Sequence, residues 1–162
     1  MDAISGATAH TIDAGGGDAL WFFGSLIEIK VDGRSDASQY DFLEMTMPVG
    51  YAPPLHSHGE EDESFFLLEG ELALLCGEER SRLLPGGYVH LPKRVPHSFR
   101  VEGDRPARIL VLSMPSGVLS FFAAIGEPAT ERVLPPVDPH DIERMQAAAN
   151  TYGIDLLGPP PF

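Results

Sequence analysis

Apolar residues in this chain come in short runs of strand length, and residues that favour turns separate the runs. The separators are rich in charged residues, glycine and proline, and the chain has 17 glycines and 15 prolines. Strand and helix patterns do not alternate as they do around a parallel sheet. The sequence therefore predicts an all-β fold, an antiparallel barrel or sandwich. The runs expected to form its strands are 19–31, 40–47, 65–68, 71–76, 88–91, 97–101 and 108–114.

The length of the chain indicates how it is divided. With 162 residues it fits about one domain of ~150 residues, which leaves no room for a second, separate domain. The first residues have little periodicity and end in a glycine-rich turn, whereas prolines gather toward the other end. We expect a flexible lead-in at 1–18, a barrel at 19–126 and a proline-rich extension at 127–162.

The extension carries one clear helix signal, at 139–152. Asp138 is a good N-cap residue, Pro139 suits the first helical position, and Gly153 suits the end of the helix. The apolar residues between them recur every three or four positions, which predicts a helix packed on the outside of the barrel. A shorter helix is expected at 117–125. The apolar stripe of the longer helix consists of Ile142, Met145, Ala149 and Tyr152.

Charge and composition exclude several classes of partner. The formal net charge of −13 repels nucleic-acid phosphates and anionic lipid surfaces. Apolar stretches are far shorter than the ~20 residues of a membrane span, and the N-terminus has no basic region before an apolar run. Cys76 is the single cysteine and forms no internal disulfide, which is typical of a reducing compartment. We therefore expect a soluble, cytoplasmic protein that binds neither nucleic acid nor membrane.

Three histidines and one glutamate form the constellation with the clearest chemistry. His56 and His58 are two residues apart, so in an extended strand both imidazoles point to the same face. Glu63 opens the next strand, and His97 opens another after a proline-rich turn. Imidazole nitrogens with one carboxylate suit a divalent transition metal, whereas calcium and magnesium prefer oxygen ligands alone. The alternative interpretation is a chance cluster of surface polar residues.

The spacing of these residues resembles the first signature of the cupin superfamily. Gly50, His56, His58, Glu63 and Gly70 occupy every fixed position of that signature. The match places the proposed ligands in a known pattern of strands and turns.

A second cupin signature is recognisable further along the chain. Gly86, Pro92 and His97 stand at its spacing, while Arg94 replaces the usual glycine and Val101 the usual asparagine. These departures concern a turn and a strand position, so the ligand set is unaffected. The resemblance covers about residues 40–115.

The resemblance implies a double-stranded β-helix, a small jelly-roll barrel, with one metal ion inside. Its ligands would be His56, His58, Glu63 and His97, and the metal would be nickel, iron, cobalt or manganese. Similar cupins often form homodimers. The residues around both signatures resemble the sequences of single-domain, quercetin 2,3-dioxygenase-like cupins. This implies a metal-dependent dioxygenase that cleaves a flavonol-like aromatic or enol substrate with dioxygen.

In that interpretation Glu63 has two roles, as a metal ligand and as the base that takes the substrate's hydroxyl proton. An enclosed apolar site is expected to raise its pKa toward neutrality. The substrate pocket would include Met45, Tyr51, Phe65 and Phe99, with Arg94 in contact with an anionic group of the substrate.

Other interpretations stay open at this point. Glu61 and Asp62 compete with Glu63 as ligand, although only Glu63 keeps the signature's distance to Gly70, and the other two are expected to be solvated loop charges. Cys76 ends an apolar run and is expected to be a small buried residue. The protein is alternatively a metal-dependent isomerase or cyclase of a natural-product pathway, or a cupin that binds small molecules without catalysis. The remaining histidines, His10, His90 and His140, are expected to have no ligand role.

Overall fold

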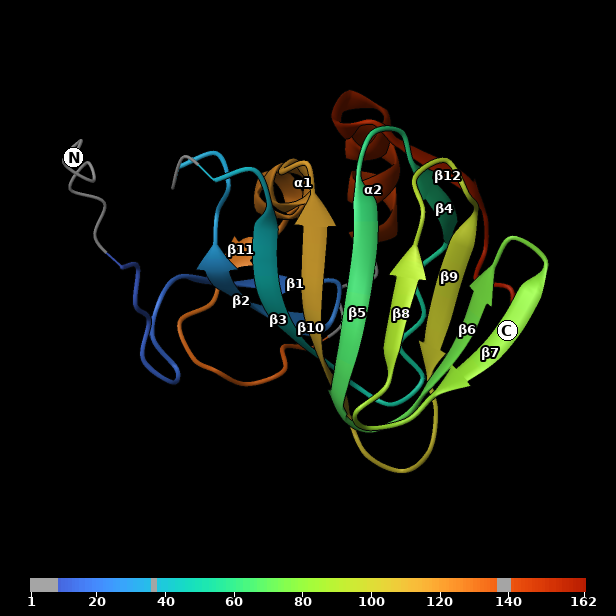
Figure 1. The fold of residues 1–162 in the computed structure, drawn as a ribbon, viewed down its shortest axis with the longest axis horizontal. Helices are drawn as coiled ribbons and strands as arrows, with labels where there is room; N and C mark the ends of the chain where they lie inside the picture. Colours follow the sequence, from blue (N-terminus) through green and yellow to red (C-terminus); the bar gives the residue numbers. More distant parts are fainter. Residues whose placement is uncertain (1–8, 36–37, 137–140) are drawn as a thin grey trace, which may run out of the picture.

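This computed structural model describes residues 9–35, 38–136 and 141–162, and it is built around two antiparallel sheets (Figure 1). The first sheet consists of β1 (Ala19–Phe22), β2 (Ser25–Val31), β3 (Asp41–Met47), β5 (Asp62–Glu69), β8 (Tyr88–Leu91), β10 (Ala107–Met114) and β11 (Glu127–Pro128). The second consists of β4 (Leu55–His58), β6 (Leu72–Cys76), β7 (Glu79–Leu83), β9 (His97–Val101) and β12 (Ile154–Gly158). Their orders are β11-β1-β2-β3-β10-β5-β8 and β12-β4-β9-β6-β7. The predicted all-β fold is confirmed.

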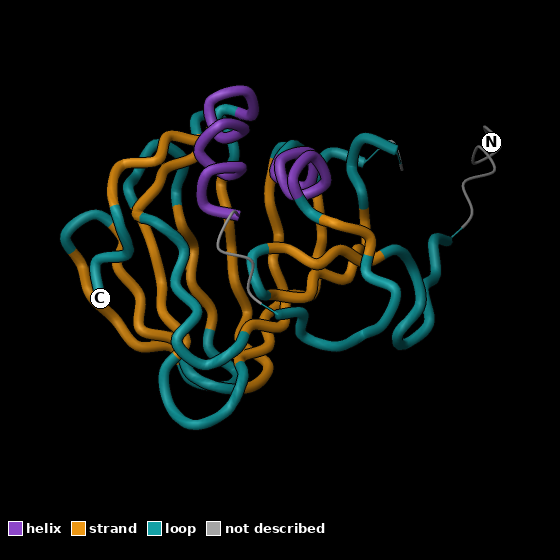
Figure 2. The backbone as a smooth tube through the Cα atoms, turned by 180° about the vertical axis from the view of Figure 1, so that it is seen from behind, coloured by secondary structure: helices purple, strands orange, loops and turns teal. Residues whose placement is uncertain are grey.

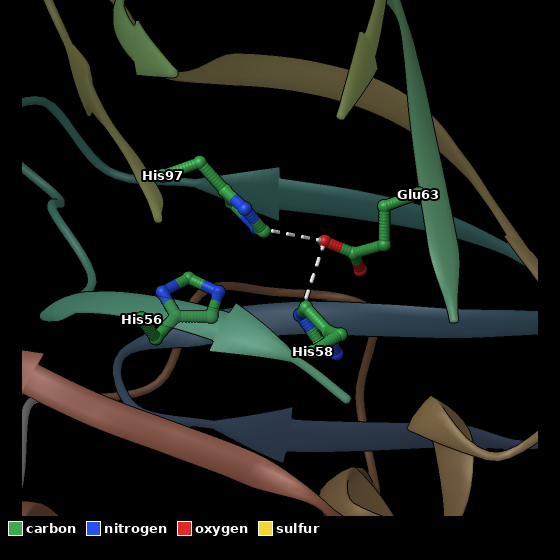
Figure 3. Close-up of side chains that lie close together, drawn as sticks. All are labelled: His56, His58, Glu63 and His97. Atoms are coloured by element: carbon green, nitrogen blue, oxygen red, sulfur yellow. Dashed lines mark ion pairs between the residues drawn. The ribbon is translucent and has the colours of Figure 1, made fainter. Parts of the chain in front are cut away.

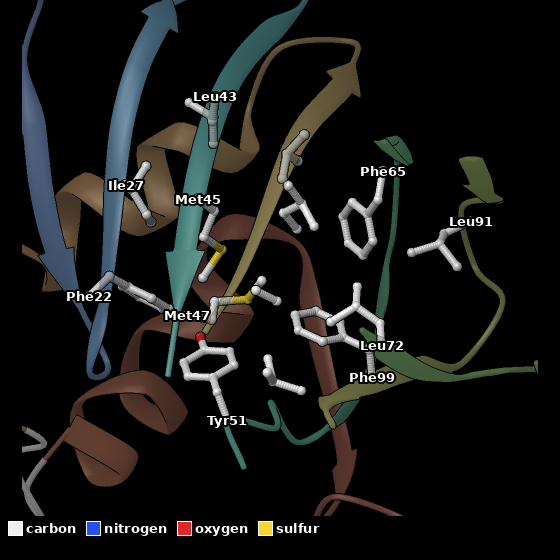
Figure 4. Close-up of a cluster of buried hydrophobic side chains, with 14 of the residues drawn as sticks. Phe22, Ile27, Leu43, Met45, Met47, Tyr51, Phe65, Leu72, Leu91 and Phe99 are labelled. Carbon is white, nitrogen blue, oxygen red and sulfur yellow. The ribbon is translucent and has the colours of Figure 1, made fainter. Parts of the chain in front are cut away.

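The core lies between the two sheets. Residues two apart in a strand share a face, and along β3 the buried Leu43 and Met47 alternate with half-buried neighbours. On the neighbouring β10, Val111 pairs with Leu43 and Ile109 pairs with Met45, and both are buried. Side chains from the second sheet, such as Phe99, meet them in the interior (Figure 4). Burying each large apolar side chain contributes about 1.5–3 kcal/mol, so this apolar interior supports the barrel.

Most strands lie where the sequence predicts them. The run 97–101 coincides with β9, and the runs 40–47 and 108–114 correspond to β3 and β10 within one residue. The expected single run 19–31 is wrong in one respect, because a turn at Phe23 and Gly24 divides it into β1 and β2. Both turn residues have a left-handed backbone, with φ of 55° and 81°. Their apolar neighbours conceal the turn in the sequence.

Two helices cover one end of the barrel (Figures 1 and 2). The expected helix at 117–125 is present as α1 (Val118–Ile125), and Asp41 Oδ2 accepts hydrogen bonds from its first N–H groups, those of Gly117 at 2.8 Å and Leu119 at 3.0 Å. The C-terminal helix is α2 (Asp141–Ala149), and a 3₁₀ turn, η1 (Asn150–Tyr152), extends it to Gly153, which has the left-handed φ of 71°. Its expected N-cap and first residue, Asp138 and Pro139, lie outside the described residues, as does the side chain of Ile142.

Within the described part of the chain, neither helix has the length and apolar character that a membrane crossing needs.

Both ends of the described chain lie against the sheets. Residues 1–8 of the expected lead-in lie outside the described chain, but Asp18 O accepts a hydrogen bond of 2.9 Å from Ile29 N in β2. At the other end, β12 pairs with β4 and forms an edge of the second sheet. The opposite edge is β7, which is exposed and polar except for Leu83. These two strands were not expected from the sequence, because neither shows a long apolar run.

Candidate metal centre

Four side chains from three strands converge in the barrel interior (Figure 3). His56 and His58 come from β4, Glu63 is the second residue of β5 and His97 is the first residue of β9. Each offers a ligand atom, and these atoms all lie within 4.8 Å of one another. The strands β5 and β9 begin at the end of the barrel that carries the helices (Figure 1). The structure therefore brings together all four residues that the sequence nominates.

The Glu63 carboxylate lies between two imidazoles. Its Oε2 atom is 3.4 Å from His58 Nε2 and 3.5 Å from His97 Nε2. The rings of His58 and His97 are nearly parallel, with an interplanar angle of 11°, whereas His56 is tilted by 72° and 61° against them. Donor atoms thus approach one region from several directions, as a metal ion requires.

Backbone carbonyls fix the tautomers of two of the histidines. His56 Nδ1 lies 2.7 Å from Pro54 O, and His97 Nδ1 lies 2.9 Å from Val95 O. Since a carbonyl only accepts, each Nδ1 carries the hydrogen, and each Nε2 presents its lone pair. His97 Nε2 and both nitrogens of His58 are buried and have no hydrogen-bond partner within the described chain. Three imidazoles and one carboxylate, with ligand nitrogens that have no hydrogen-bond partner, fit a divalent transition metal.

Burial and charge shift the pKa of three members of the cluster. Burial, together with the neighbouring His97 and His58, lowers the pKa of His56 to about 4. Burial also opposes the charged form of His58, but the Glu63 carboxylate outweighs it and raises the pKa of His58. For Glu63 burial favours the neutral acid, yet the two imidazoles lower the pKa well below its ordinary value. The expectation that an enclosed site raises the pKa of Glu63 is therefore wrong.

A largely apolar cavity adjoins the cluster. Its wall includes His56, His58 and Glu63, so the cluster faces the cavity directly. The four residues expected to form the pocket, Met45, Tyr51, Phe65 and Phe99, also line it (Figure 4). The Tyr51 ring stacks on Phe99 with a centroid distance of 6.1 Å.

Part of the cavity wall comes from segments to which the sequence assigned no pocket role. The helix α1 contributes Phe121 and Phe122, and the strand β12 contributes Ile154 and Leu156. The helix α2, expected only to pack outside the barrel, contributes Met145 to the same wall. The spacing of apolar residues revealed the apolar stripe of this helix. It did not reveal that Met145 of the stripe faces the cavity. The complete lining is Phe22, Met45, Tyr51, Pro53, Pro54, His56, His58, Glu63, Phe65, Phe99, Val111, Val118, Phe121, Phe122, Met145, Ile154 and Leu156.

Arg94, which the sequence places in contact with an anionic group of the substrate, is not among the residues that line this cavity. Its side chain is 69% exposed, and it donates one hydrogen bond to Glu60 Oε1 and another to Gly59 O, each of 3.0 Å. Its backbone has a φ of 63°, a left-handed conformation that glycine adopts with less strain. The turn therefore directs the guanidinium into solvent, at the position where the cupin signature has glycine.

The acidic neighbours of Glu63 take other positions. Asp62 Oδ1 accepts a hydrogen bond of 2.9 Å from Lys93 N. Glu61 is only 8% exposed, and its carboxylate lies where a side chain on Gly117 would begin. The expectation that Glu61 is a solvated loop charge is wrong, because the loop folds it against the start of α1. The four-residue cluster includes Glu63 and neither of these two.

The other reactive side chains are not members of the cluster, although Cys76 is the cross-strand partner of His97. His90 is exposed, and its Nδ1 lies 3.3 Å from Ser64 Oγ. His10 Nε2 lies 3.1 Å from Lys30 O, and His140 lies outside the described residues. Cys76 is partly exposed, and burial, followed by the charge of Glu79, raises the pKa of its thiol. A raised pKa disfavours the reactive thiolate.

Comparison with known proteins agrees with this geometry. Quercetin 2,3-dioxygenase of Bacillus subtilis (strain 168) is 28% identical over 150 residues, which are 91% of this chain and 44% of that protein. Dimethylsulfoniopropionate lyase DddQ of Ruegeria pomeroyi is 43% identical over 67 residues, which are 41% of this chain and 32% of that protein. This chain thus spans less than half the length of either relative.

A solved structure with a similar fold and one family model both relate this chain to cupins. A solved sugar phosphate isomerase from a cupin superfamily, from Silicibacter pomeroyi, has a TM-score of 0.56 at 20% identity, over 66% of this chain and 76% of that chain. At this identity the likeness concerns the fold alone. The family model described as "Cupin domain" matches residues 43–113, which include all four residues of the cluster. These matches identify residues 43–113 of the chain as a cupin domain.

Proposed function

We propose that the protein is a metal-dependent dioxygenase that cleaves a flavonol-like aromatic or enol small molecule. The observation that carries the proposal is the buried cluster of three imidazoles and one carboxylate that opens onto a largely apolar cavity. The similarity to quercetin 2,3-dioxygenase of Bacillus subtilis, which extends over 91% of this chain, supports the choice of reaction. The proposed ligands are His56, His58, Glu63 and His97.

Nickel, iron, cobalt or manganese at this position would supply Lewis acidity to an enolate or phenolate oxygen and electron exchange with dioxygen. The protein's share begins with presenting the ligand atoms. The carbonyls of Pro54 and Val95 hold the rings of His56 and His97 with Nε2 toward the cluster. Such partners behind a ligand orient it and raise its basicity.

Glu63 is proposed to accept the proton of the substrate's hydroxyl. Its lowered pKa keeps the carboxylate ionised at neutral pH, and the same shift makes it a weaker proton acceptor than an ordinary glutamate. Glu63 is 5% exposed and lines the cavity. A proton on Glu63 therefore stays next to the substrate and away from bulk water.

The cavity wall is proposed to select a flat, uncharged substrate. Aromatic rings of Phe22, Phe65, Phe99, Phe121 and Phe122 line it, and such rings favour stacked or edge contacts with another ring. Among the described lining residues, Glu63 is the one acidic side chain, and lysine and arginine are absent. The wall therefore offers no cation to a phosphate or carboxylate group of a substrate, and it excludes water during the reaction.

The proposal includes a homodimer, supported by the outer face of the first sheet. Phe66 and Tyr88 are cross-strand partners on β5 and β8 and are 40% and 62% exposed, and the nearby Leu112 and Met114 of β10 are also exposed. Adjacent exposed apolar residues commonly mark an interface. Light scattering on the purified protein tests this, and a monomer at micromolar concentration would contradict it.

One experiment tests the proposed reaction. The metal content of the purified protein is measured, and flavonols and related enols are screened with an oxygen electrode. We expect about one divalent metal ion per chain and oxygen uptake with at least one planar enol or phenol. Turnover without oxygen uptake would instead indicate an isomerase or cyclase, and binding without turnover would indicate a non-catalytic cupin.

A further inference from the structure

One buried serine beside the cluster has no partner. Along β10 the inward positions are Ala107, Ile109, Val111 and Ser113, of which only the last is polar. Ser113 is 0% exposed, and its Oγ has no hydrogen-bond partner within the described chain. An unpartnered buried hydroxyl destabilises a folded protein, and alanine would fill the same space without this penalty. The hydroxyl therefore calls for an explanation other than packing.

The pairing of the sheet places Ser113 next to two carboxylates. Its cross-strand partner on β5 is Glu63, and its partner on β3 is Asp41. Directly paired residues point to the same face of a sheet, with Cβ atoms about 4.5–5.5 Å apart. All three side chains are buried. The hydroxyl thus lies in a polar row on the inner face of the first sheet, at the end where the cluster lies.

The carboxylates of Asp41 and Glu63 differ in whether they can accept a further hydrogen bond. Asp41 is already committed, because its two oxygens accept hydrogen bonds from the backbone N–H groups of Gly33, Gly117 and Leu119, at 2.8 to 3.0 Å. Glu63 points Oε2 at the imidazoles of His58 and His97. Its other oxygen, Oε1, is the acceptor to which the neighbouring hydroxyl can donate.

We propose that Ser113 is a positioning residue for Glu63: its hydroxyl, which has no partner within the described chain, would donate a hydrogen bond to Glu63 Oε1 once Oε2 serves as a metal ligand. This inference rests on the ligand role of Glu63 in the proposed function. That hydrogen bond would hold the Glu63 carboxylate in one orientation, with a single oxygen offered to the metal. A hydroxyl both donates and accepts, so the same side chain also accommodates Glu63 after it has taken up a proton.

The test uses the full chain, with Co(II) as the probe. Ser113→Ala removes the hydroxyl and almost nothing else. We expect this variant to bind Co(II) about 10–100-fold more weakly in a chelator competition titration, as is typical when a partner behind a ligand is lost. The visible absorption bands of bound Co(II) should also change, because the carboxylate is no longer held on one oxygen. Ser113→Thr, which restores the hydroxyl, should recover most of the affinity.

Thermal unfolding of the chelator-treated protein separates positioning from packing. The Ser113 hydroxyl has no partner in the fold itself, so Ser113→Ala should not lower the melting temperature before metal is added. Ser25 is the matched control, since it is equally buried but donates a hydrogen bond to Phe22 O. Ser25→Ala should lower the melting temperature and leave Co(II) affinity unchanged.

Three outcomes would overturn the inference. Wild-type affinity in Ser113→Ala would show that the hydroxyl does not hold Glu63. Weaker binding together with a lower melting temperature before metal addition would show a structural role. A wild-type protein that binds no Co(II) would overturn the proposed metal site as well, whereas the first two outcomes leave that site intact.

Discussion

His56 and His97 are direct cross-strand partners on β4 and β9, and the centroids of their imidazole rings lie 4.5 Å apart. The pairing of the two strands therefore holds these rings together independently of any ion. A site built on paired strands varies less in geometry than one built on loops. The cluster is in this sense preorganised by the sheet.

Removing either of these rings should abolish metal binding. We expect His56→Ala and His97→Ala to lose stoichiometric metal while they keep their fold, because the interior that supports the barrel is apolar. Elemental analysis measures the metal, and circular dichroism measures the fold. His90→Ala is the control and should keep the wild-type content, since His90 is exposed on β8. Unchanged metal in both ligand variants would refute the proposed site.

A change at Glu63 should separate its two proposed roles. Glu63→Gln keeps an oxygen that can coordinate but removes the charge, so we expect metal affinity to fall by about 10–100-fold. Turnover at saturating metal should fall by about 100- to 10,000-fold, because the proton acceptor is lost. Steady-state kinetics on a metal-loaded sample measures this. A loaded variant that turns over at the wild-type rate would assign the proton transfer to another group.

Metal binding should depend on pH through His58. A ligand imidazole must be neutral. Burial opposes protonation of His58, but the Glu63 carboxylate raises its pKa above the ordinary 6.5, so protons compete with the metal there. His56, with a pKa of about 4, stays neutral over the same range. Co(II) affinity should therefore be full above the raised pKa of His58 and fall by about tenfold per pH unit below it. Isothermal titration at several pH values measures this, and an affinity that rises toward acid pH would contradict it.

The two glycines of the first cupin signature should differ in how much an alanine destabilises the fold. Both have a left-handed backbone, with φ of 79° at Gly50 and 82° at Gly70. A Cβ at Gly50 would meet no atom within 4 Å, but at Gly70 it would lie 2.6 Å from Ala107 Cα and 2.8 Å from Pro106 O. We expect Gly50→Ala to cost about 1 kcal/mol, the strain of the turn alone, and Gly70→Ala to cost about 3 kcal/mol or more. Urea unfolding measures both, and equal losses would show that the close contact is relieved at little cost.

The sequence predicted the cluster because its signals are local. His56 and His58 reveal a shared face by their spacing alone, and β9 was expected at the residues where it lies. The strand β12 was missed because its place beside β4 depends on a pairing between distant parts of the chain. The direction of the pKa shift of Glu63 was missed for a related reason. It depends on the distances to His58 and His97, which no spacing rule supplies.

The candidate metal ligands and part of the cavity wall come from different regions of the chain, and β12 belongs to the second region. All four candidate ligands lie within 43–113, whereas the cavity wall is completed by α1, Met145 of α2, and Ile154 and Leu156 of β12. A fragment cut at the end of the matched segment would retain every ligand but leave β4 as an unpaired edge beside an open cavity. Changes after residue 113 can thus alter the shape of the cavity without touching the ligands, and the last third of the chain is the place to redesign which molecule fits.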